Sequence, residues 1–257
     1  MKRILVTGST DGVGRATADA LLDDRNQVVV HARTTARLAA VQDLIDRGAE
    51  AVVGDLSDLH EVADLVAQAN SLGPFDAVVH NAGVLHGAVL PVNVTAPYLM
   101  TAGIKRPGRL IYLSSSMHRG GRADLSGVDW TGKRETRSYS DAKLFVTTLM
   151  AAVARIRPDV VAHAVDPGWV PTRMGGPGAS DNLALAHVTQ AWLATTANPE
   201  ALVSGRYWRH QRTERPHPAV HDKGFQHELL SSLAEQTGVA LPAAHDADAD
   251  ADADADA

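Results

Sequence analysis

The chain of 257 residues has no cysteine and few aromatic residues. Without cysteine it can form neither disulfides nor thiolate-ligated metal sites, and this composition fits a reducing compartment. An aromatic content of 4% gives no sign of a stacking pocket for a large ring. No segment has about 18 consecutive apolar residues, so no membrane span is expected. Hydrophobic residues make up 45% of the chain, which suits one large α/β domain or two small ones.

Net charge is also absent once the C-terminal end is set aside. The formal net charge is −6, and the Asp-Ala repeat from Asp246 to Asp256 contains six aspartates. Removing these six charges leaves a net charge of zero, so the rest of the chain gives no general electrostatic reason to bind nucleic acid or an anionic membrane. Because a repeat of small and acidic residues cannot build a core, we predict a disordered tail at residues 241–257. A passive, solvated tail is favoured over an interaction segment.

The N-terminus shows no leader-like pattern. Met1 to Val6 runs directly into a strand-like stretch, whose apolar part is too short for a signal peptide and stops at Gly8. We therefore expect a cytoplasmic protein.

Strand-like and helix-like segments alternate along the first half of the chain. Short apolar runs typical of buried strands occupy residues 2–7, 26–33, 51–56, 75–80 and 110–116. Helix-compatible stretches lie at residues 15–22, at 34–47 and from 59 to the Gly73-Pro74 break. This alternation predicts a parallel sheet with helices on both faces, in which ligands bind at the carboxyl ends of the strands.

The first strand leads into a glycine-rich turn that is followed by a helix. Glycines let the backbone approach a diphosphate closely, and a helix N-terminus offers free N–H groups and the positive end of its dipole. The spacing is Gly-x-x-x-Gly-x-Gly rather than the commoner Gly-x-Gly-x-x-Gly. The predicted phosphate-binding residues are Gly8, Ser9, Thr10, Asp11, Gly12, Val13 and Gly14.

Arg33 lies at the end of the second predicted strand, where a dinucleotide fold meets the adenosine ribose. An acidic residue there would bind the 2′-hydroxyl of NAD, whereas an arginine suits the 2′-phosphate of NADP. Arg37 follows one turn later, and the strand end has no acid. These residues favour NADP over NAD. The alternative for Arg33 is an ordinary surface arginine.

Tyr139 and Lys143 are four residues apart in a run that is mostly helix-compatible, so their side chains would share one helix face. An ammonium near a phenol favours the phenolate and would lower the tyrosine pKa from its usual value of about 10. The tyrosine could then donate or accept a proton near neutral pH. Taken alone, such a pair is more often part of a solvated helix face.

Five ordered motifs together resemble those of the short-chain dehydrogenase/reductase family. They are Thr7-Gly8-x-x-x-Gly12-x-Gly14, Asp55-Leu56, Asn81-Ala82-Gly83, Tyr139-x-x-x-Lys143, and Asp166-Pro167-Gly168 with Thr172. His80 stands where the family usually has a second asparagine. The resemblance covers residues 2–240. It implies a single doubly wound α/β domain (a Rossmann fold) at residues 1–240, with a largely parallel sheet of about seven strands.

The resemblance also implies roles for individual residues. Tyr139, Lys143 and Ser115 would be catalytic, with Ser114 and Ser116 as weaker candidates for the serine, and Asn93 would support a proton-relay water. Tyr139 and Lys143 would also contact the cofactor. The remaining cofactor-binding residues implied by the motifs are Asp55, Leu56, Asn81, Ala82, Gly83, Pro167, Gly168, Val170 and Thr172. No metal site is implied, and His210, His217, His221 and His227 have no zinc-like spacing.

Two further segments bear on the branch of the family and on assembly. The long polar stretch at 117–138 with Trp130, together with Ser-Ser-x-x-His ending at His118, resembles the branch near retinol dehydrogenases. The stretch from Gly83 to Arg109 is shorter than this branch implies, and Pro97 would lie in the first turn of its helix. Because the family commonly packs this helix against a partner subunit, the shortening puts the usual oligomer and the proton relay in question.

The resemblance implies an NADP-dependent oxidoreductase that transfers hydride between nicotinamide and a small-molecule carbonyl or alcohol. The competing hypothesis is a dinucleotide-binding sensor or scaffold that has lost catalysis. The shortened segment favours the second hypothesis, whereas intact Ser115, Tyr139 and Lys143 favour the first.

Overall fold

The computed structural model describes residues 1–105 and 107–242. The Asp-Ala repeat predicted to be a disordered tail lies outside the described residues. Eight strands form one sheet in the order β3-β2-β1-β4-β5-β6-β7-β8. The strands are β1 (Arg3–Val6), β2 (Gln27–Ala32), β3 (Glu50–Val53), β4 (Ala77–His80), β5 (Arg109–Leu113), β6 (Val161–Asp166), β7 (Arg206–Arg209) and β8 (Arg212–Glu214). The first seven are parallel, and β8 is antiparallel to β7.

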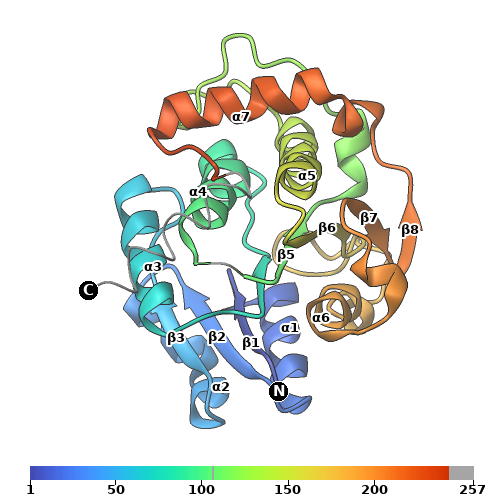
Figure 1. Ribbon diagram of the computed structural model, residues 1–257. Coiled ribbons are helices and arrows are strands. Elements are labelled where there is room, and N and C mark those ends of the chain that lie inside the picture. The colour runs from blue at the N-terminus through green and yellow to red at the C-terminus, as the bar shows by residue number, and fades with distance from the viewer. Residues whose placement is uncertain (106, 243–257) are drawn as a thin grey trace.

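The predicted doubly wound parallel sheet and single domain are confirmed (Figure 1). The sheet has one strand more than the expected number because β7 and β8 form a two-residue hairpin. His210 and Gln211 make the turn with φ angles of 49° and 58°, and two positive φ values are typical of a type I′ turn. Because His-Gln is not a dipeptide that signals such a turn, β8 could not be predicted from the local pattern.

The described chain has seven α-helices, and six of them cover the two faces of the sheet (Figure 1). The seven helices are α1 (Gly12–Asp23), α2 (Gln42–Asp46), α3 (Leu59–Ser71), α4 (Ala96–Gly103), α5 (Tyr139–Ile156), α6 (Val188–Thr195) and α7 (Lys223–Thr237). The core residues of α1, α2 and α6 pack with one face of the sheet, and those of α3, α4 and α5 pack with the other. Helix α7 lies outside α5.

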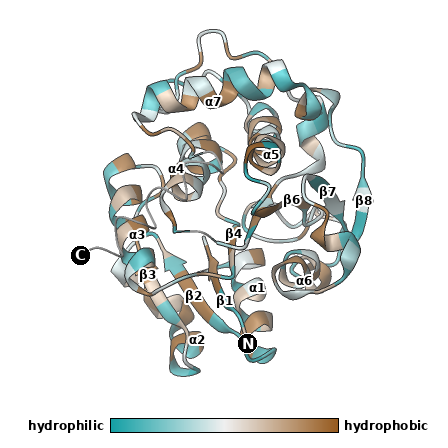
Figure 2. Cartoon of the chain, in the orientation of Figure 1, coloured by the Kyte–Doolittle hydropathy of each residue, from teal (hydrophilic) through white to brown (hydrophobic). Residues whose placement is uncertain are grey.

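Strand side chains alternate between the two hydrophobic cores. Leu5 and Val29 belong to the core beneath α3, α4 and α5, whereas Ile4 and Val28 belong to the core beneath α1, α2 and α6. Burial on both faces explains why these strands read as continuous apolar runs in the sequence. Figure 2 shows hydrophobic residues along the inner strands, while β8 at the sheet edge is mostly hydrophilic.

The helix predicted at residues 34–47 is only partly α-helical. A 3₁₀ helix occupies Thr35–Val41 and α2 follows as a short α-helix. Thr34 makes no capping hydrogen bond, and the first turn is closed by the short-range bond from Arg37 N to Thr34 O, 2.9 Å. Such bonds between residues three apart tighten a turn into the 3₁₀ form.

The segment expected to be shortened contains a brief helix. A π-helical turn at Pro91–Thr95 leads into α4, which has eight residues, and Pro97 lies in its first turn as predicted. The hydroxyl of Tyr98 donates to the carbonyl of Val239 at 2.6 Å, so α4 contacts the segment that follows α7. None of the helices in residues 1–105 and 107–242 combines the length and the apolar character that a membrane span needs.

Candidate active site

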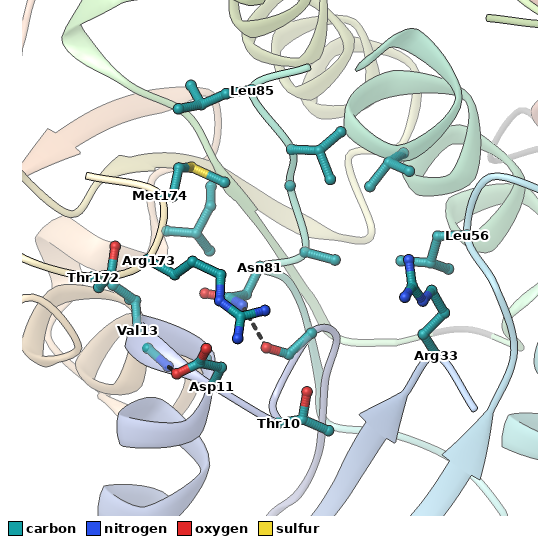
Figure 3. Close-up of a pocket in the computed structure, with 18 of the residues that line it drawn as sticks. Thr10, Asp11, Val13, Arg33, Leu56, Asn81, Leu85, Thr172, Arg173 and Met174 are labelled. Atoms are coloured by element: carbon teal, nitrogen blue, oxygen red, sulfur yellow. Dashed lines mark hydrogen bonds between the residues drawn. The ribbon is translucent and has the colours of Figure 1, made fainter. Parts of the chain in front are cut away.

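A cavity of about 640 Å³ opens where the parallel strands end (Figure 3). This volume is in the range of small-molecule and cofactor sites. The predicted site residues that line it are Gly8, Thr10, Asp11, Gly12, Val13, Gly14, Arg33, Asp55, Leu56, Asn81, Ala82, Gly83, Tyr139, Lys143, Pro167 and Thr172. Ser9, Asn93, Ser115, Gly168 and Val170 are not among its lining residues. Residues far apart in the sequence therefore meet at one edge of the sheet.

The glycine turn joins β1 to α1 and leaves no room for side chains at two of its positions. Gly8 has φ 63°, and a Cβ there would lie 2.9 Å from the Cα of Ala82. A Cβ on Gly14 would collide with the Asn81 side chain and the Gly8 carbonyl. Asp11 caps α1 by accepting a hydrogen bond from Gly12 N at 2.7 Å. The turn thus presents backbone and a helix N-terminus to the cavity, the arrangement that binds phosphate.

Asn81 and Ala82 hold the turn against the end of β4. The amide nitrogen of Asn81 donates to the carbonyl of Thr7 at 2.8 Å, and Ala82 N donates to the Thr7 hydroxyl at 3.0 Å. The motif Asn81-Ala82-Gly83 therefore fixes the glycine turn as well as lining the cavity.

His31, at the end of β2, is a structural residue of the turn that the sequence did not single out. Its Nδ1 accepts a hydrogen bond from Gly8 N at 2.9 Å, and its Nε2 lies 2.8 Å from the carbonyl of Gly54. Only the tautomer protonated on Nε2 satisfies both contacts. Burial lowers the pKa of His31, which keeps the ring neutral. Ser9, predicted to bind phosphate, lies buried, and its hydroxyl accepts a hydrogen bond from His31 N at 2.7 Å.

Arg33 follows β2 and is exposed at the rim of the cavity, near Leu56 (Figure 3). Arg37 donates a hydrogen bond to the Thr10 hydroxyl at 3.2 Å. Asp55, which also lines the cavity, stabilises the turn that follows it. Its carboxylate accepts hydrogen bonds from Ser57 N and Ser57 Oγ at 2.9 and 2.8 Å. An anion that reached this rim would meet the Arg33 guanidinium without displacing an internal ion pair among the described residues.

Gly83 lies in a narrow space between Asn93 and Lys143. A Cβ on Gly83 would be 2.9 Å from Asn93 Oδ1 and 3.5 Å from Lys143 Nζ. Asn93 is buried, and its amide bonds both backbone groups of Val84: Oδ1 accepts at 2.9 Å and Nδ2 donates at 2.8 Å. Asn93 thus holds the loop after Gly83 and keeps one further hydrogen-bonding capacity on each amide atom.

Tyr139 and Lys143 lie on the first turns of α5, as their spacing predicts. Ser138 caps this helix in a reciprocal capping box with Asp141. Lys143 Nζ lies 5.4 Å from the centroid of the Tyr139 ring and donates to the carbonyl of Leu113 at 2.7 Å. Both side chains line the cavity.

The predicted lowering of the Tyr139 pKa is wrong for this structure. Burial raises the pKa of Tyr139, the charge of Asp166 raises it further, and a hydrogen bond with Ser115 opposes both. Lys143 does not offset this rise, because its ammonium faces the ring and the Leu113 carbonyl. Burial also lowers the pKa of Lys143 to about 8, with Asp166 acting in the opposite direction.

The three serines after β5 have different environments. Ser114 is buried and its hydroxyl pairs with that of Thr147 at 2.6 Å. Ser115 caps the 3₁₀ helix Ser116–Gly120 by accepting from Met117 N at 3.2 Å, and it is the serine that hydrogen-bonds Tyr139. Ser116 is exposed. Ser114 lines the cavity and Ser115 does not, but only Ser115 of the three serines hydrogen-bonds Tyr139.

The segment after β6 closes the other side of the cavity. Gly168 has φ 89° and donates its N–H to Asp166 Oδ1 at 2.8 Å, while the Val170 carbonyl accepts from Thr172 N at 2.8 Å. Gly168 and Val170 thus stabilise the turn after β6 without lining the cavity. The Thr172 methyl lies 3.2 Å from where a Cβ on Gly12 would be, so this segment touches the glycine turn.

A buried polar network behind the site was not predicted. The hydroxyl of Tyr207 donates to Asp166 Oδ2 at 3.1 Å, and the Tyr207 ring packs on His118, with centroids 4.6 Å apart. His118 Nδ1 bonds the Ser115 carbonyl at 2.7 Å, and its Nε2 accepts from His217 N at 3.0 Å. The network links the backbone of Ser115 to the carboxylate of Asp166. Two of its members carried a signal in the sequence: His118 through the Ser-Ser-x-x-His motif and Asp166 through the Asp166-Pro167-Gly168 motif.

The long segment at 117–138 contacts α7 through Trp130. Trp130 is buried, its Nε1 donates to Ser232 Oγ at 2.8 Å, and its ring packs near Phe145. The histidines at 210, 217, 221 and 227 do not assemble a site, because no group of potential metal ligands occurs in the described part of the chain.

Comparison with known proteins agrees with this geometry. The family model described as short chain dehydrogenase matches residues 2–182. The chain belongs to the short-chain dehydrogenase/reductase family. It is accordingly an enzyme of the oxidoreductase class whose members act on CH–OH groups, and the family predicted from the five motifs is confirmed.

Relatives match over nearly the whole chain. An uncharacterized oxidoreductase of Emericella nidulans is 38% identical, covering 94% of this chain and 99% of the relative. The short-chain dehydrogenase chyC of Penicillium rubens is 33% identical over 95% of this chain and 100% of its own length. Dehydrogenase/reductase SDR family member 13 of Bos taurus is 27% identical over 91% of this chain and 73% of its own, and this similarity supports the predicted branch.

Solved structures share the fold. A crystal structure of an uncharacterized protein from Mycobacterium paratuberculosis superposes with a TM-score of 0.76 at 21% identity, covering 94% of this chain and 95% of that one. A blue fluorescent protein from a metagenomic library, in complex with NADPH, gives 0.66 at 23% identity, covering 81% and 95%.

Proposed function

We propose that this chain is an NADP-dependent oxidoreductase that transfers hydride between nicotinamide and a small-molecule carbonyl or alcohol. The observation that carries the proposal is one cavity lined at one end by the glycine turn and at the other by Tyr139 and Lys143. A phosphate-binding turn and a proton-donating pair within the same cavity suit a dinucleotide and a substrate that lie end to end.

The residues present fit a dinucleotide. Gly8 and Gly14 keep the cradle free of side chains, and the N-terminus of α1 offers its N–H groups and dipole. Asn81 and His31 hold the turn in place from behind. When bound, the nicotinamide supplies or accepts the hydride, and the chain supplies position and proton transfer.

Arg33 is the residue that favours NADP. It lies exposed at the end of β2, where the turn that follows carries no acid to receive a ribose 2′-hydroxyl. A guanidinium can bind a 2′-phosphate with two parallel hydrogen bonds. The NADPH in the blue fluorescent protein structure, which shares this fold, is in line with this preference.

Tyr139 donates the proton to the carbonyl oxygen in the reductive direction. Its raised pKa keeps the hydroxyl protonated at neutral pH, and its hydrogen bond with Ser115 lets both hydroxyls converge on one oxygen. Ser115 stabilises the negative charge that develops there. Lys143 contributes a positive charge one turn away, and Asn93 positions the loop beside it.

Apolar side chains surround the substrate end. Leu85, Val92 and Met174 line the cavity beyond Gly83, and Figure 3 shows Leu85 and Met174 on the side away from Arg33. We expect a substrate with an apolar body, bound by burial of that surface rather than by ion pairing.

The test is a titration of the purified protein with NADPH and separately with NADH, followed by nicotinamide fluorescence. Tight NADPH binding, weak NADH binding and turnover of a carbonyl compound are expected. Tyr139→Phe should reduce turnover by about 10²- to 10⁴-fold, the usual contribution of a general acid, while NADPH affinity stays unchanged. Near-normal turnover in Tyr139→Phe would refute the assigned roles. Dinucleotide binding without turnover of any carbonyl compound would favour a sensor or scaffold.

A further inference from the structure

The short segment Thr172–Met174 crosses the cavity between its two ends. Thr172 Cγ2 lies 3.2 Å from the position of a Cβ on Gly12, at the start of α1. Met174 Cε lies 3.9 Å from the corresponding position on Gly83, which is itself 3.5 Å from Lys143 Nζ. Arg173, between these two residues, therefore lies above the middle of the cavity, and it is one of the residues that line it.

This segment is held in a compact turn. Gly176 N donates to the Thr172 carbonyl at 2.9 Å, and Gly175 N donates to the Thr172 hydroxyl at 3.2 Å. Trp169 Nε1 donates to the Gly175 carbonyl at 2.9 Å. A backbone fixed in this way lowers the entropy lost when Arg173 contacts a ligand.

The guanidinium of Arg173 makes no hydrogen bond or ion pair with residues 1–105 or 107–242. Arg209 on β7, in contrast, pairs with Asp181 at 3.2 Å. Figure 3 shows the Arg173 side chain extended toward Asn81 and the glycine turn, on the opposite side from Leu85. Its charge therefore faces the phosphate-binding side of the cavity rather than the apolar substrate end.

The charges around the glycine turn favour a cation at this place. Asp11 lines the cavity and puts a carboxylate at the start of α1. A bound diphosphate would add two further negative charges beside it, and like charges at short range repel. Of the other cations that line the described cavity, Arg33 lies near Leu56, and Lys143 is bonded to the Leu113 carbonyl. Arg173 is placed to compensate the charge over the turn.

We propose that Arg173 binds the diphosphate of the dinucleotide from the loop side, opposite the N-terminus of α1. This inference rests on the proposed function. The two arginines then have different targets, since Arg173 contacts the diphosphate that NADP and NAD share, whereas Arg33 contacts the 2′-phosphate that only NADP carries.

The experiment compares dissociation constants for NADPH and NADH in the wild type and in Arg173→Gln, Arg173→Lys and Arg33→Gln. Arg212→Gln, on the exposed strand β8, is the matched control. We expect Arg173→Gln to weaken both dinucleotides by a similar factor of about 10- to 100-fold, the range of hydrogen bonds to charged groups. Arg173→Lys should recover most of the loss. Arg33→Gln should weaken NADPH alone, and Arg212→Gln should change neither.

ADP-ribose and AMP provide a second measurement, because only the first contains the diphosphate. Arg173→Gln should weaken ADP-ribose and leave AMP unchanged. Three results would overturn the inference while the proposed function stands: unchanged affinity for both dinucleotides, a loss confined to NADPH, or an effect only on the KM of the carbonyl substrate. A wild-type protein that binds neither dinucleotide would overturn the proposed function and the inference with it.

Discussion

Lys143 Nζ, on α5, donates a hydrogen bond of 2.7 Å to the main-chain carbonyl of Leu113, at the end of β5. The ammonium is almost fully buried, and burial lowers its pKa to about 8. A charge that water would solvate freely in the unfolded chain is thus kept in the core beside the candidate site. Groups with pKa values perturbed in this way cluster where proteins do chemistry, and the fold loses stability by keeping them.

Replacing Lys143 with methionine should therefore stabilise the protein at neutral pH while abolishing turnover. A pKa that falls from 10.5 to about 8 on folding corresponds to roughly 3 kcal/mol of destabilisation at pH 7. Loss of the bond to Leu113 offsets about 1 kcal/mol of that, so we expect a net gain of about 2 kcal/mol. The unfolded chain binds more protons between pH 8 and 10.5, so the wild type should recover stability as the pH rises through this window, and the difference should shrink. Urea unfolding at several pH values measures it.

The exposed Lys223 provides the control for that prediction. Lys223→Met, on the first turn of α7, should change the free energy of unfolding little at any of these pH values. A Lys143→Met variant that is less stable than the wild type at pH 7 would show that the ammonium is better paired than the Leu113 contact indicates.

Alanine substitutions of Ser114 and Ser115 should differ in their effect on kcat. Ser115 hydrogen-bonds Tyr139, whereas Ser114 pairs with the buried Thr147 hydroxyl at 2.6 Å. Ser115→Ala should lower kcat by about 10²- to 10³-fold, as loss of an oxyanion-stabilising donor does, and loss of its cap on the 3₁₀ helix should also lower the free energy of unfolding by about 1 kcal/mol. Ser114→Ala should lower the free energy of unfolding by about 1 kcal/mol and leave kcat within a few-fold. Steady-state kinetics and urea unfolding on both variants measure the two effects, and a reversed pattern would reassign the serine.

The parts of the fold that the sequence predicted are those with strong local signals. The glycine turn, the strand ends at Arg33, Asp55 and Asn81, and the pair on α5 each combine a recognisable residue type with a fixed spacing. Each comes directly after a strand or opens a helix, so the rule that ligands bind at the carboxyl ends of parallel strands brought them to one cavity.

The parts that the sequence missed depend on contacts between distant segments. His31 reads as an ordinary strand residue until Gly8 and Gly54 are seen on either side of its ring. The Tyr139 pKa was predicted from its helix neighbour alone, whereas burial and Asp166, 27 positions further along the chain, decide its direction. Burial of a side chain and charges from distant segments cannot be predicted from a short stretch of sequence.

Buried histidines should make the fold sensitive to mild acid. His31, His80, His118 and His163 are all buried, and burial lowers the pKa of each, for His80 to about 3. Because the folded pKa values lie below the unfolded value of about 6.5, the stability from keeping these rings neutral is present above pH 6.5 and is lost as the pH falls below it. All four groups act in the same direction, so we expect lower stability at pH 5.5 than at pH 7.5, with about 1 kcal/mol of the loss coming from His80.

His80 gives that prediction a matched pair of variants. His80→Asn restores the residue usual in the family and removes one titrating group, so its loss of stability between pH 7.5 and 5.5 should be about 1 kcal/mol smaller than that of the wild type. His227→Gln, at an exposed position on α7, should keep the full dependence. Equal pH dependence in wild type and His80→Asn would mean that His80 is protonated in the fold without cost.

Helix α7 covers the outer side of α5, and we therefore expect a monomer. Phe225 packs on Phe145 with ring centroids 6.0 Å apart, Arg155 Nε donates to Gln226 Oε1 at 2.7 Å, and Tyr98 on α4 bonds the Val239 carbonyl. A partner subunit that docked on α4 and α5 would have to displace these contacts, and the eight residues of α4 offer little surface in exchange. Light scattering coupled to size exclusion should give the 27.2 kDa of one chain across a wide range of protein concentrations. A stable species of twice that mass would contradict the expected monomer. Phe225→Ala would then show whether α7 belongs to the dimer interface, because a dimer that forms through another face would persist in this variant.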